Sequence, residues 1–567
     1  MWARGVRLGV AALCVFVGGV RGDGGVPAEA PADLALTPEN TAWADALSHY
    51  AWGVLRQSED ASTFDEVQTQ FVAALRLAPG SRALLQQAVA GWLVKGDFEA
   101  LLGTVRPLAD GNPEVAHLQL MVALATQAKG QPDEALAFLE AAFARQHRKA
   151  PELLRELVAM HWRQKRYDDV AGVLHRSRNQ PGIKGSFSHA YASALYHHSL
   201  SARPEGVDVS ERQAARHRRL ALEQATKAAQ RIGLDSEAKD IDSLFEVFAD
   251  CEEWEQALAF LRAAAVEYPD LDDAIGMQQA ICLRELGRDD EALERLDQIA
   301  TRADPDPTLY AELGRQFIQL HEPERAAMSF TRALFLAPAS ERLRVTLGFV
   351  WLQLDKPQRA LALLRPIRSP SPAARLLTAK AYHALRQWTD ALDTLAEAET
   401  AARAAGDDEF FNVDLYLTYA SIHVDAGDID QAVEAAERAV HLEPDNPVAA
   451  NFLGYVLADG NRRLDEAERL IAAAVAQDPE NEAYLDSLAW VHFRQGRYAE
   501  AMAEIAHALR AGGDEPDPVI LDHAGDIFSA GNCPLLASYY WWSAIQRGAA
   551  NADLIRQKLR GPPFPAE

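Results

Sequence analysis

Small and large apolar residues recur with helical spacing along most of the chain. Each set begins with Ala, has a larger apolar residue four positions later, and ends with a small residue three positions after that. Because positions i, i+4 and i+7 fall on one face of a helix, each set predicts an amphipathic helix. The clear sets are Ala135-Leu139-Ala142, Ala257-Leu261-Ala264, Ala326-Phe330-Ala333, Ala391-Leu395-Ala398, Ala467-Ile471-Ala474, Ala501-Ile505-Ala508 and Ala537-Trp541-Ala544.

A further small residue lies about twelve positions before the leading Ala of most sets. This also holds for sets that match the pattern only approximately. Small side chains on facing helices let the two backbones approach closely. The spacing therefore predicts hairpins in which a first helix crosses a second helix at these residues. Phe245, the counterpart before Ala257, marks a less regular hairpin. The small residues are Ala123, Ala280, Gly314, Gly348, Ala379, Ala420, Gly454, Ala489 and Gly525.

Turn and stop residues separate these helices. Glycine in a turn signal, as at Gly130, Gly287, Gly427 and Gly496, falls between the two helices of a pair. Proline follows the second helix and prevents its continuation. These prolines are Pro79, Pro269, Pro338, Pro444 and Pro479.

A helix–turn–helix unit of about 34 residues with small residues at the crossing resembles the tetratricopeptide repeat, TPR. The resemblance covers nearly the whole chain after its leader and is strongest in 287–300, 325–338, 426–447 and 496–509. It implies an all-α fold, an α-solenoid or superhelix of about 12–13 repeats with a concave inner wall. One hairpin cannot bury its apolar stripe alone, so neighbouring hairpins must stack.

The N-terminus has the features of a signal peptide. In residues 1–22, two arginines precede an apolar run over 8–20, and the small residue Gly22 precedes the expected cut. The run is too short to span a membrane comfortably, and no other segment is long and apolar enough. Leu13 stands before Cys14, where a bacterial lipobox needs a small residue, so a lipid anchor is not favoured. We expect an exported protein, periplasmic or associated with the outer membrane.

The remaining chain is expected to follow a simple plan. A linker occupies 23–40, and N-terminal repeats with an insertion at 199–230 occupy 41–236. Central repeats follow over 237–410, C-terminal repeats over 411–550 and a tail over 551–567. The insertion is longer than a repeat turn permits, and 399–408 is a second extension. Either stretch could be a hinge between superhelical segments. A basic cluster in the insertion has two interpretations, a solvated face of a long helix or a contact for an acidic group. It consists of Arg212, Arg216, His217, Arg218 and Arg219.

Charge and chemistry narrow the functional classes. The formal net charge of −26 argues against nucleic acid as the main partner. It indicates either solubility of a large surface or an acidic docking surface for basic partners. Cys251 and Cys282 are predicted to be free thiols, or a bridge if adjacent repeats bring them together. We find no nucleophile elbow, P-loop, HExxH or CxxC, and the adjacent His197 and His198 make a poor metal pair. The sequence thus predicts no enzyme, no cofactor and no metal site.

The TPR resemblance implies where a partner would bind. The first helix of each TPR pair lines the groove, which assigns eight residues in three successive repeats. Tyr455 and Trp490 could instead pack between repeats, and Asp486 and Asp522 could cap helices or be solvated. Arg315, Gln319, Phe349 and Gln353 are weaker candidates. The eight residues are Asn451, Tyr455 and Asp459, then Asp486, Trp490 and Arg494, then Asp522 and Asp526.

Residues 451–501 with 517–532 look like the C-terminal block of exported bacterial TPR proteins. These include outer-membrane lipoprotein adaptors that bind a carboxy-terminal-processing protease and present cell-wall hydrolases to it. The resemblance implies a non-catalytic periplasmic scaffold or adaptor for protein partners, such as a processing protease or other envelope proteins. The alternative is a scaffold subunit of an envelope polysaccharide assembly or export system. The sequence does not predict the oligomeric state.

Overall fold

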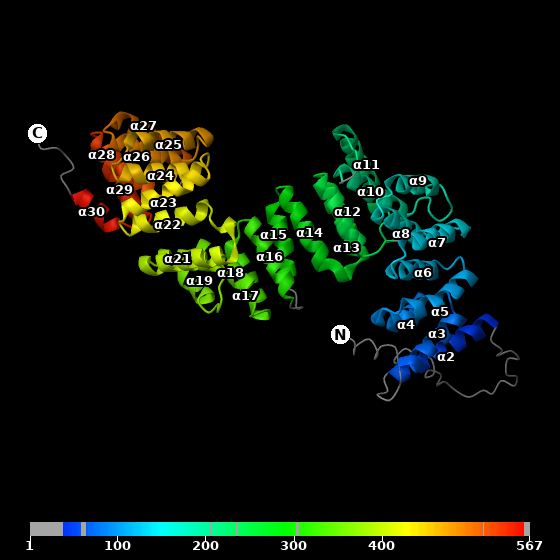
Figure 1. Cartoon of the computed structure of the whole chain (residues 1–567). Coiled ribbons are helices and arrows are strands. Elements are labelled where there is room, and N and C mark those ends of the chain that lie inside the picture. The colour runs from blue at the N-terminus through cyan, green and yellow to red at the C-terminus, as the bar shows by residue number, and fades with distance from the viewer. Residues whose placement is uncertain are drawn as a thin grey trace, which may run out of the picture. The chain divides into compact units, whose positions relative to one another are not determined.

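The computed structural model describes residues 38–57, 64–204, 207–233, 236–301, 306–513 and 515–560. Within these ranges it contains 29 α-helices, two short 3-10 helices and no β-strand. Successive helices run back and forth as hairpins (Figure 1). The all-α repeat array predicted from the sequence is confirmed for the described ranges. The predicted signal peptide, most of the linker and residues 561–567 lie outside them.

The chain divides into two compact units, Met1–Gln278 and Gln279–Glu567, and the division falls within α14 (Asp272–Glu285). The other helices of the first unit are α2 (Pro38–Gln57), α3 (Phe64–Leu77), α4 (Arg82–Lys95), α5 (Phe98–Gly111), α6 (Ala116–Ala128), α7 (Pro132–Arg145), α8 (Pro151–Arg163), α9 (Tyr167–Ser177), α10 (Phe187–Ser201), α11 (Glu211–Ala229), α12 (Asp240–Asp250), α13 (Trp254–Glu267) and η1 (Pro269–Leu271).

The second unit continues the same pattern. Its helices are α15 (Asp289–Ala300), α16 (Pro307–Gln319), α17 (Pro323–Leu336), α18 (Glu341–Gln353), α19 (Pro357–Leu364), α20 (Pro372–Ala384), α21 (Trp388–Ala405), η2 (Asp408–Phe410), α22 (Val413–Asp425), α23 (Ile429–Leu442), α24 (Pro447–Asp459), α25 (Leu464–Gln477), α26 (Glu482–Arg494), α27 (Tyr498–Ala511), α28 (Pro518–Ala530), α29 (Pro534–Gln546) and α30 (Ala552–Arg560).

The predicted small residues lie where the helices of a pair cross. A β-carbon added to Gly454 of α24 would lie 2.5 Å from Cγ1 of Ile471 in α25. The space a side chain would need on the first helix is thus filled by the large residue of the second helix. The same relation joins Gly314 to Phe330, Gly348 to Leu364 and Gly525 to Trp541.

A single residue with positive φ turns the chain between the two helices of most pairs. Glycine adopts this left-handed conformation without strain and occupies it at Gly130, Gly287, Gly427 and Gly496, as the turn signals predict. Other residue types occupy the corresponding place in further hairpins, which hides those turns from a search for glycine. They are Lys165, Glu252, His321, Asp355, Arg386, Asn461 and Asn532.

The sequence predicts about 12–13 repeats, and the described helices provide slightly more helix pairs than that. Helices α2 to α29 form fourteen successive pairs, and α30 follows them. The α2–α3 pair shows why a hairpin escapes the sequence pattern. Its set is Val67-Phe71-Ala74, with Val in place of the leading Ala, although Gly53 meets the ring of Phe71 in the usual way.

Two stretches take forms that the sequence plan did not describe. Residues 199–230 contain the end of α10, connecting residues described over 202–204 and 207–210, and the whole of α11. This helix is the second of an ordinary pair and is lengthened to 19 residues. The predicted tail begins with the helix α30, so residues 552–560 are part of the folded unit. The extension at 399–408 lengthens α21 and includes the start of η2.

Candidate functional site

The eight predicted residues lie on three neighbouring first helices. α24 packs beside α26, and α26 packs beside α28. We call the side chains at these positions the first-helix face. On α24 they are Asn451, Tyr455 and Asp459, on α26 Asp486, Trp490 and Arg494, and on α28 Asp522 and Asp526.

His523 lies at the centre of this face, although the sequence analysis did not select it. Its Nδ1 lies 2.9 Å from Oδ2 and 3.0 Å from Oδ1 of Asp486. Its ring stacks on Trp490 with a centroid distance of 4.2 Å and lies 6.2 Å from the ring of Tyr455. His523 on α28 therefore connects side chains of α24 and α26.

Electrostatics favour the charged form of His523. Burial alone would lower its pKa, but the charge and the hydrogen bond of Asp486 raise the pKa above the ordinary value of 6.5. Asp486 and His523 are both buried. The carboxylate of Asp486 is thus already compensated by a cation of the same chain. It is neither a helix cap nor a solvated side chain.

Asp522 and Asp526 are also compensated within the chain. Nζ of Lys558 on α30 donates hydrogen bonds to Oδ1 of Asp522 at 2.8 Å and to Oδ2 of Asp526 at 2.7 Å. Asn551 donates to Asp522, and the indole of Trp541 donates to Asp526. These contacts attach α30 to the last hairpin. A basic partner could therefore pair with either carboxylate only by displacing Lys558.

Asn451, Tyr455 and Trp490 carry the remaining hydrogen-bonding capacity of the face. Asn451 Oδ1 and Trp490 Nε1 are buried, and neither finds a hydrogen-bond partner among the described residues. Burial raises the pKa of the Tyr455 phenol, and the charges of Asp459 and Asp486 add to this, so the O–H is retained as a donor. Trp490 is only 7% exposed and belongs to a core cluster, so the packing interpretation holds for its ring.

The outer end of the face carries the most accessible charges. Asp459 is exposed, and Arg494 is half-buried. Their charged groups lie 4.0 Å apart, and the guanidinium of Arg494 lies 5.9 Å from the centroid of the Trp490 ring. An exposed pair at this distance contributes little to stability. A bound segment can therefore separate Asp459 from Arg494 at low cost.

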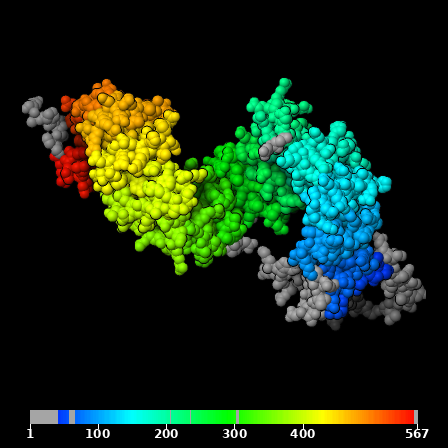
Figure 2. Space-filling model, in the orientation of Figure 1, coloured from blue at the N-terminus to red at the C-terminus, as the bar shows by residue number. Residues whose placement is uncertain are grey.

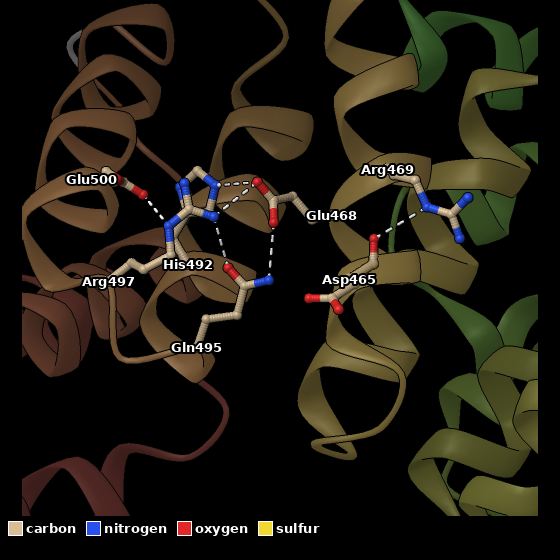
Figure 3. A network of polar contacts seen from close by, with 7 residues as sticks. All are labelled: Asp465, Glu468, Arg469, His492, Gln495, Arg497 and Glu500. Carbon is tan, nitrogen blue, oxygen red and sulfur yellow. Dashed lines mark hydrogen bonds and ion pairs between the residues drawn. The ribbon is translucent and has the colours of Figure 1, made fainter.

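A polar network holds α26 against the preceding repeat (Figure 3). Glu468 of α25 accepts hydrogen bonds from Gln495 at 2.9 Å and from Arg497 at 2.9 Å, and it lies 3.3 Å from Nε2 of His492. These hydrogen bonds, from Gln495 and Arg497 first, lower the pKa of Glu468 to about 2. Arg497 also pairs with Glu500. The network therefore attaches α26, and the turn that follows it, to α25.

The first unit contains a cavity at equivalent positions that the sequence analysis missed. It has a volume of about 390 Å³ and lies along α8 and α10. Its lining includes residues spaced i, i+4 and i+8, namely Arg155, Ala159 and Arg163 on α8 and Tyr191, Leu195 and Ser199 on α10. Asn451, Tyr455 and Asp459 have the same spacing on α24. This shared register is the sequence signal that could have revealed the cavity. It was missed because the search began from Ala sets on second helices, and α9 and α11 lack such a set.

Aromatic rings and compensated charges form the walls of this cavity. Trp162 and Tyr196 meet edge to face at 6.3 Å, and the guanidinium of Arg155 lies 5.0 Å from the centroid of the Tyr191 ring. Arg155 forms an ion pair with the buried Asp240. The cavity therefore offers an apolar, aromatic pocket whose lining arginines also hold intramolecular contacts.

The described residues offer little for metal binding. No group of three or more His, Cys, Asp or Glu side chains in the described ranges is placed to hold a metal ion. His197 and His198 point to different partners. Nδ1 of His197 lies 2.9 Å from Nδ1 of His217, whereas His198 pairs with Asp250. Cys251, Cys282 and Cys533 are free thiols, so the alternative of a bridge between Cys251 and Cys282 is excluded. No described helix combines the length and apolar character of a membrane span.

Comparison with known families identifies the repeat type of the C-terminal hairpins. Residues 417–482 and 457–516 match the family model of the tetratricopeptide repeat. The matched region runs from α22 to the end of α27 and includes two of the three first helices that form the first-helix face. Residues 417–516 thus match tetratricopeptide repeats, within a TPR-like array of helices over the described ranges.

Individual relatives match over limited stretches. A TPR repeat-containing protein of Pseudomonas aeruginosa is 34% identical over 115 residues, which are 20% of this chain and 19% of the relative. Cellulose synthase operon protein C of Xanthomonas axonopodis pv. citri is 29% identical over 257 residues, which are 44% of this chain and 14% of the relative. The chain thus spans less than a fifth of either relative. Among solved structures, APC/C hetero-tetramer Cut9-Hcn1 has a TM-score of 0.40 at 13% identity, over 91% of this chain and 93% of that chain.

Proposed function

We propose that this chain is a non-catalytic scaffold that binds segments of protein partners on the first-helix face. The observation that supports this most is the pair of buried polar atoms without partners, Asn451 Oδ1 and Trp490 Nε1. One is an acceptor and the other is a donor. A peptide group offers one N–H donor and one C=O acceptor, so an extended segment can satisfy both. Both atoms are shielded from water, so binding requires a small rearrangement of the rings around them.

Recognition by this face combines three kinds of contact. Tyr455 offers a protonated hydroxyl, Arg494 and Asp459 offer opposite charges at the outer end, and Trp490 offers part of a rigid ring. Many modest contacts on a preformed surface give affinity without a large ordering cost. The cavity of the first unit adds an aromatic pocket at the equivalent register for a second contact.

Two variants with the same chemical change test the proposal. In Asn451→Ala with Tyr455→Phe, an amide and a hydroxyl are removed from the first-helix face. In Gln431→Ala with Tyr498→Phe, the same groups are removed from second helices, where both residues are exposed. Tagged full-length protein is used to capture partners from an envelope fraction. We expect the first variant to lose partners that the wild type and the second variant retain. Equal capture by all three proteins would place binding elsewhere.

The more specific proposal is an adaptor in the cell envelope that presents substrates to a processing protease. It is supported by the resemblance of residues 451–501 and 517–532 to exported TPR adaptors. A second candidate is a scaffold subunit of an envelope polysaccharide system, which the similarity to cellulose synthase operon protein C favours. The identity of the partner lost in the first-helix variant separates the two. A protease supports the adaptor, and a component of a polysaccharide synthase supports the alternative.

Both candidates depend on export, which we propose from residues 1–22. The expected cut follows Gly22, so that the mature protein begins at Asp23. Fractionation of a bacterial host with analysis of the mature N-terminus tests this. A cytosolic protein that retains residues 1–22 would contradict export.

A further inference from the structure

The first two turns of α11 carry an unusual group of arginines. Arg212, Arg216, Arg218 and Arg219 are all exposed, in a chain with a net charge of −26. Within the part of the chain that the structure describes, none of the four has an ion pair or a side-chain hydrogen bond. By contrast, some exposed arginines of the second unit, such as Arg403 and Arg438, pair with a glutamate one turn away.

α11 lacks the carboxylates that would balance these charges. Its own acids are Glu211 and Glu223. Glu211 lies 3.9 Å from Arg203, and Glu223 lies 2.6 Å from Lys227, so both already have a partner. Like charges one turn apart on a helix repel each other. The N-terminal half of α11 is therefore a surface of uncompensated positive charge.

The arginines are arranged as a continuous face rather than scattered. Arg212, Arg216 and Arg219 are spaced i, i+4 and i+7, and together with Ser210, Gln213 and Ala215 they line a shallow hollow of about 580 Å³. We call Arg212, Arg216 and Arg219 the arginine face. α11 is a second helix, so this face is separate from the first-helix positions that line the cavity of α8 and α10. Figure 2 shows the α10–α11 hairpin, in teal, standing out from the surface of the first unit.

Two neighbouring histidines respond to this positive charge. Burial is the main cause that lowers the pKa of His217 on α11, and the charge of Arg216 lowers it further. Burial and the charges of His217 and Arg216 together lower the pKa of His197 on α10. The lowered pKa values favour the neutral forms of both histidines, so the positive charge at this surface comes from the arginines.

The surroundings select among anionic partners. A guanidinium fork matches carboxylate or phosphate groups, since both accept two parallel hydrogen bonds. Docking on a membrane surface normally adds exposed aromatic or large aliphatic side chains to the cations. In the described part of the chain, no large hydrophobic side chain between Leu124 and Val266 is exposed. The net charge of the chain also disfavours a nucleic acid. Carboxylates of a protein fit these conditions best.

We propose that the arginine face of α11 binds an acidic segment of a protein partner. Glu or Asp side chains of that segment form ion pairs with Arg212, Arg216 and Arg219. The arginine face lies in the first unit and the first-helix face in the second, so this proposal does not depend on binding at the first-helix face.

A labelled octaglutamate peptide and the full-length chain test this proposal. Binding is followed by fluorescence anisotropy at low and at physiological salt. The variant Arg212→Gln, Arg216→Gln, Arg219→Gln removes three charges from the arginine face. The matched control Arg403→Gln, Arg438→Gln, Arg462→Gln removes three exposed arginines that are paired with glutamate or aspartate in the second unit. Both variants change the net charge equally.

We expect the arginine-face variant to bind the peptide about tenfold more weakly and the control to stay within about twofold of wild type. Equal losses in the two variants would show a general charge effect and overturn the proposal. Vesicles with one third phosphatidylglycerol form a second arm. Binding to vesicles but not to the peptide, dependent on the arginine face, would assign the surface to lipid and also overturn it. Circular dichroism checks the fold, and the single variant Arg216→Gln, expected to bind about threefold more weakly, serves if the triple variant does not fold.

Discussion

The imidazole Nδ1 of His523 lies 2.9 Å from the carboxylate Oδ2 of Asp486, and both side chains are buried. The pair joins α26 to α28, so it connects two consecutive repeats through a charge interaction as well as through apolar packing. Trp490 stacks on the same imidazole. The geometry of the first-helix face therefore depends on the contacts of one histidine.

The first prediction concerns Asp486 and alkaline pH. Burial alone would lower the pKa of His523, but Asp486 raises it above 6.5. Because the pKa of His523 is higher in the folded than in the unfolded chain, protonation of His523 stabilises the fold. This stabilisation is complete below pH 6.5 and is lost as pH rises through the folded pKa. Asp486→Ala should cost about 3 kcal/mol below pH 6.5, because it leaves a buried histidine without its partner. The cost should shrink at higher pH, where His523 is neutral.

Calorimetric unfolding of the wild type and Asp486→Ala between pH 6 and 9 measures this effect. The control is Asp459→Ala, whose carboxylate is exposed and lies 4.0 Å from Arg494. The control should change stability little across the same range. A difference between wild type and Asp486→Ala that stays constant with pH would rule out the charged pair.

The second prediction concerns the acid side and the α10–α11 hairpin. Burial, with the charges of His217 and Arg216, lowers the pKa of His197 from 6.5 to about 4. A depressed pKa means that the unfolded chain binds the proton more readily, so stability falls as pH drops from 6.5 towards about 4. We expect His197→Asn to flatten this loss by about 1 kcal/mol, after allowance for solvent screening.

Thermal unfolding between pH 7 and 4.5 tests the role of His197. His175→Asn is the matched control, since His175 is an exposed histidine of the same unit. The control should keep the acid slope of the wild type. If His197→Asn keeps it too, the titration of His197 is not the origin of the slope.

The third prediction tests the crossing of paired helices. A β-carbon on Gly525 would lie 2.2 Å from Cδ1 of Trp541, whose indole is held by Asp526. Gly525→Ala should therefore overpack the α28–α29 crossing and cost about 1–3 kcal/mol, although Ala favours a helix over Gly. Gly103→Ala in α5 meets no atom within 4 Å and should be neutral or stabilising by up to about 1 kcal/mol. Urea unfolding of both variants gives the comparison. Equal effects would contradict the crossing geometry.

The fourth prediction concerns the thiols. Cys282 is fully buried, and burial raises its pKa to about 12, whereas Cys251 and Cys533 are half-buried. Because the thiolate is the reactive form, Cys282 should resist alkylation in the folded chain. Peptide mass spectrometry after brief iodoacetamide treatment should find label on Cys251 and Cys533, and on Cys282 only after denaturation. Rapid labelling of Cys282 in the native chain would show that the repeat around it is open.

The sequence predicts the hairpins better than it predicts the site. Small residues such as Gly454 must face a large partner wherever two helices cross, so spacing alone reveals the crossing. The set of α3 escaped because Val67 replaces the leading Ala. The pairing of His523 with Asp486, and of Lys558 with Asp522, joins residues more than thirty positions apart. Such contacts follow from how successive hairpins stack, which the pattern within one hairpin does not show.

Contacts between successive hairpins also change the interpretation of part of the predicted site. Tyr455, Asp486 and Trp490 all lie around the ring of His523. The expectation that acidic residues there select a basic partner does not take account of His523 and Lys558, which already compensate Asp486 and Asp522. The cavity along α8 and α10 was missed because its hairpins carry no Ala set, although Arg155 and Tyr191 stand at the equivalent positions.

Photocrosslinking in a living host tests most directly whether the first-helix face binds a protein. A photoreactive phenylalanine analogue replaces Tyr455 in one full-length variant and Tyr498 in another, because Tyr498 is an exposed tyrosine on the second helix α27. We predict a crosslink to a distinct protein from position 455 and none from position 498. Crosslinks of equal yield from both positions, or from position 498 alone, would contradict binding on the first-helix face.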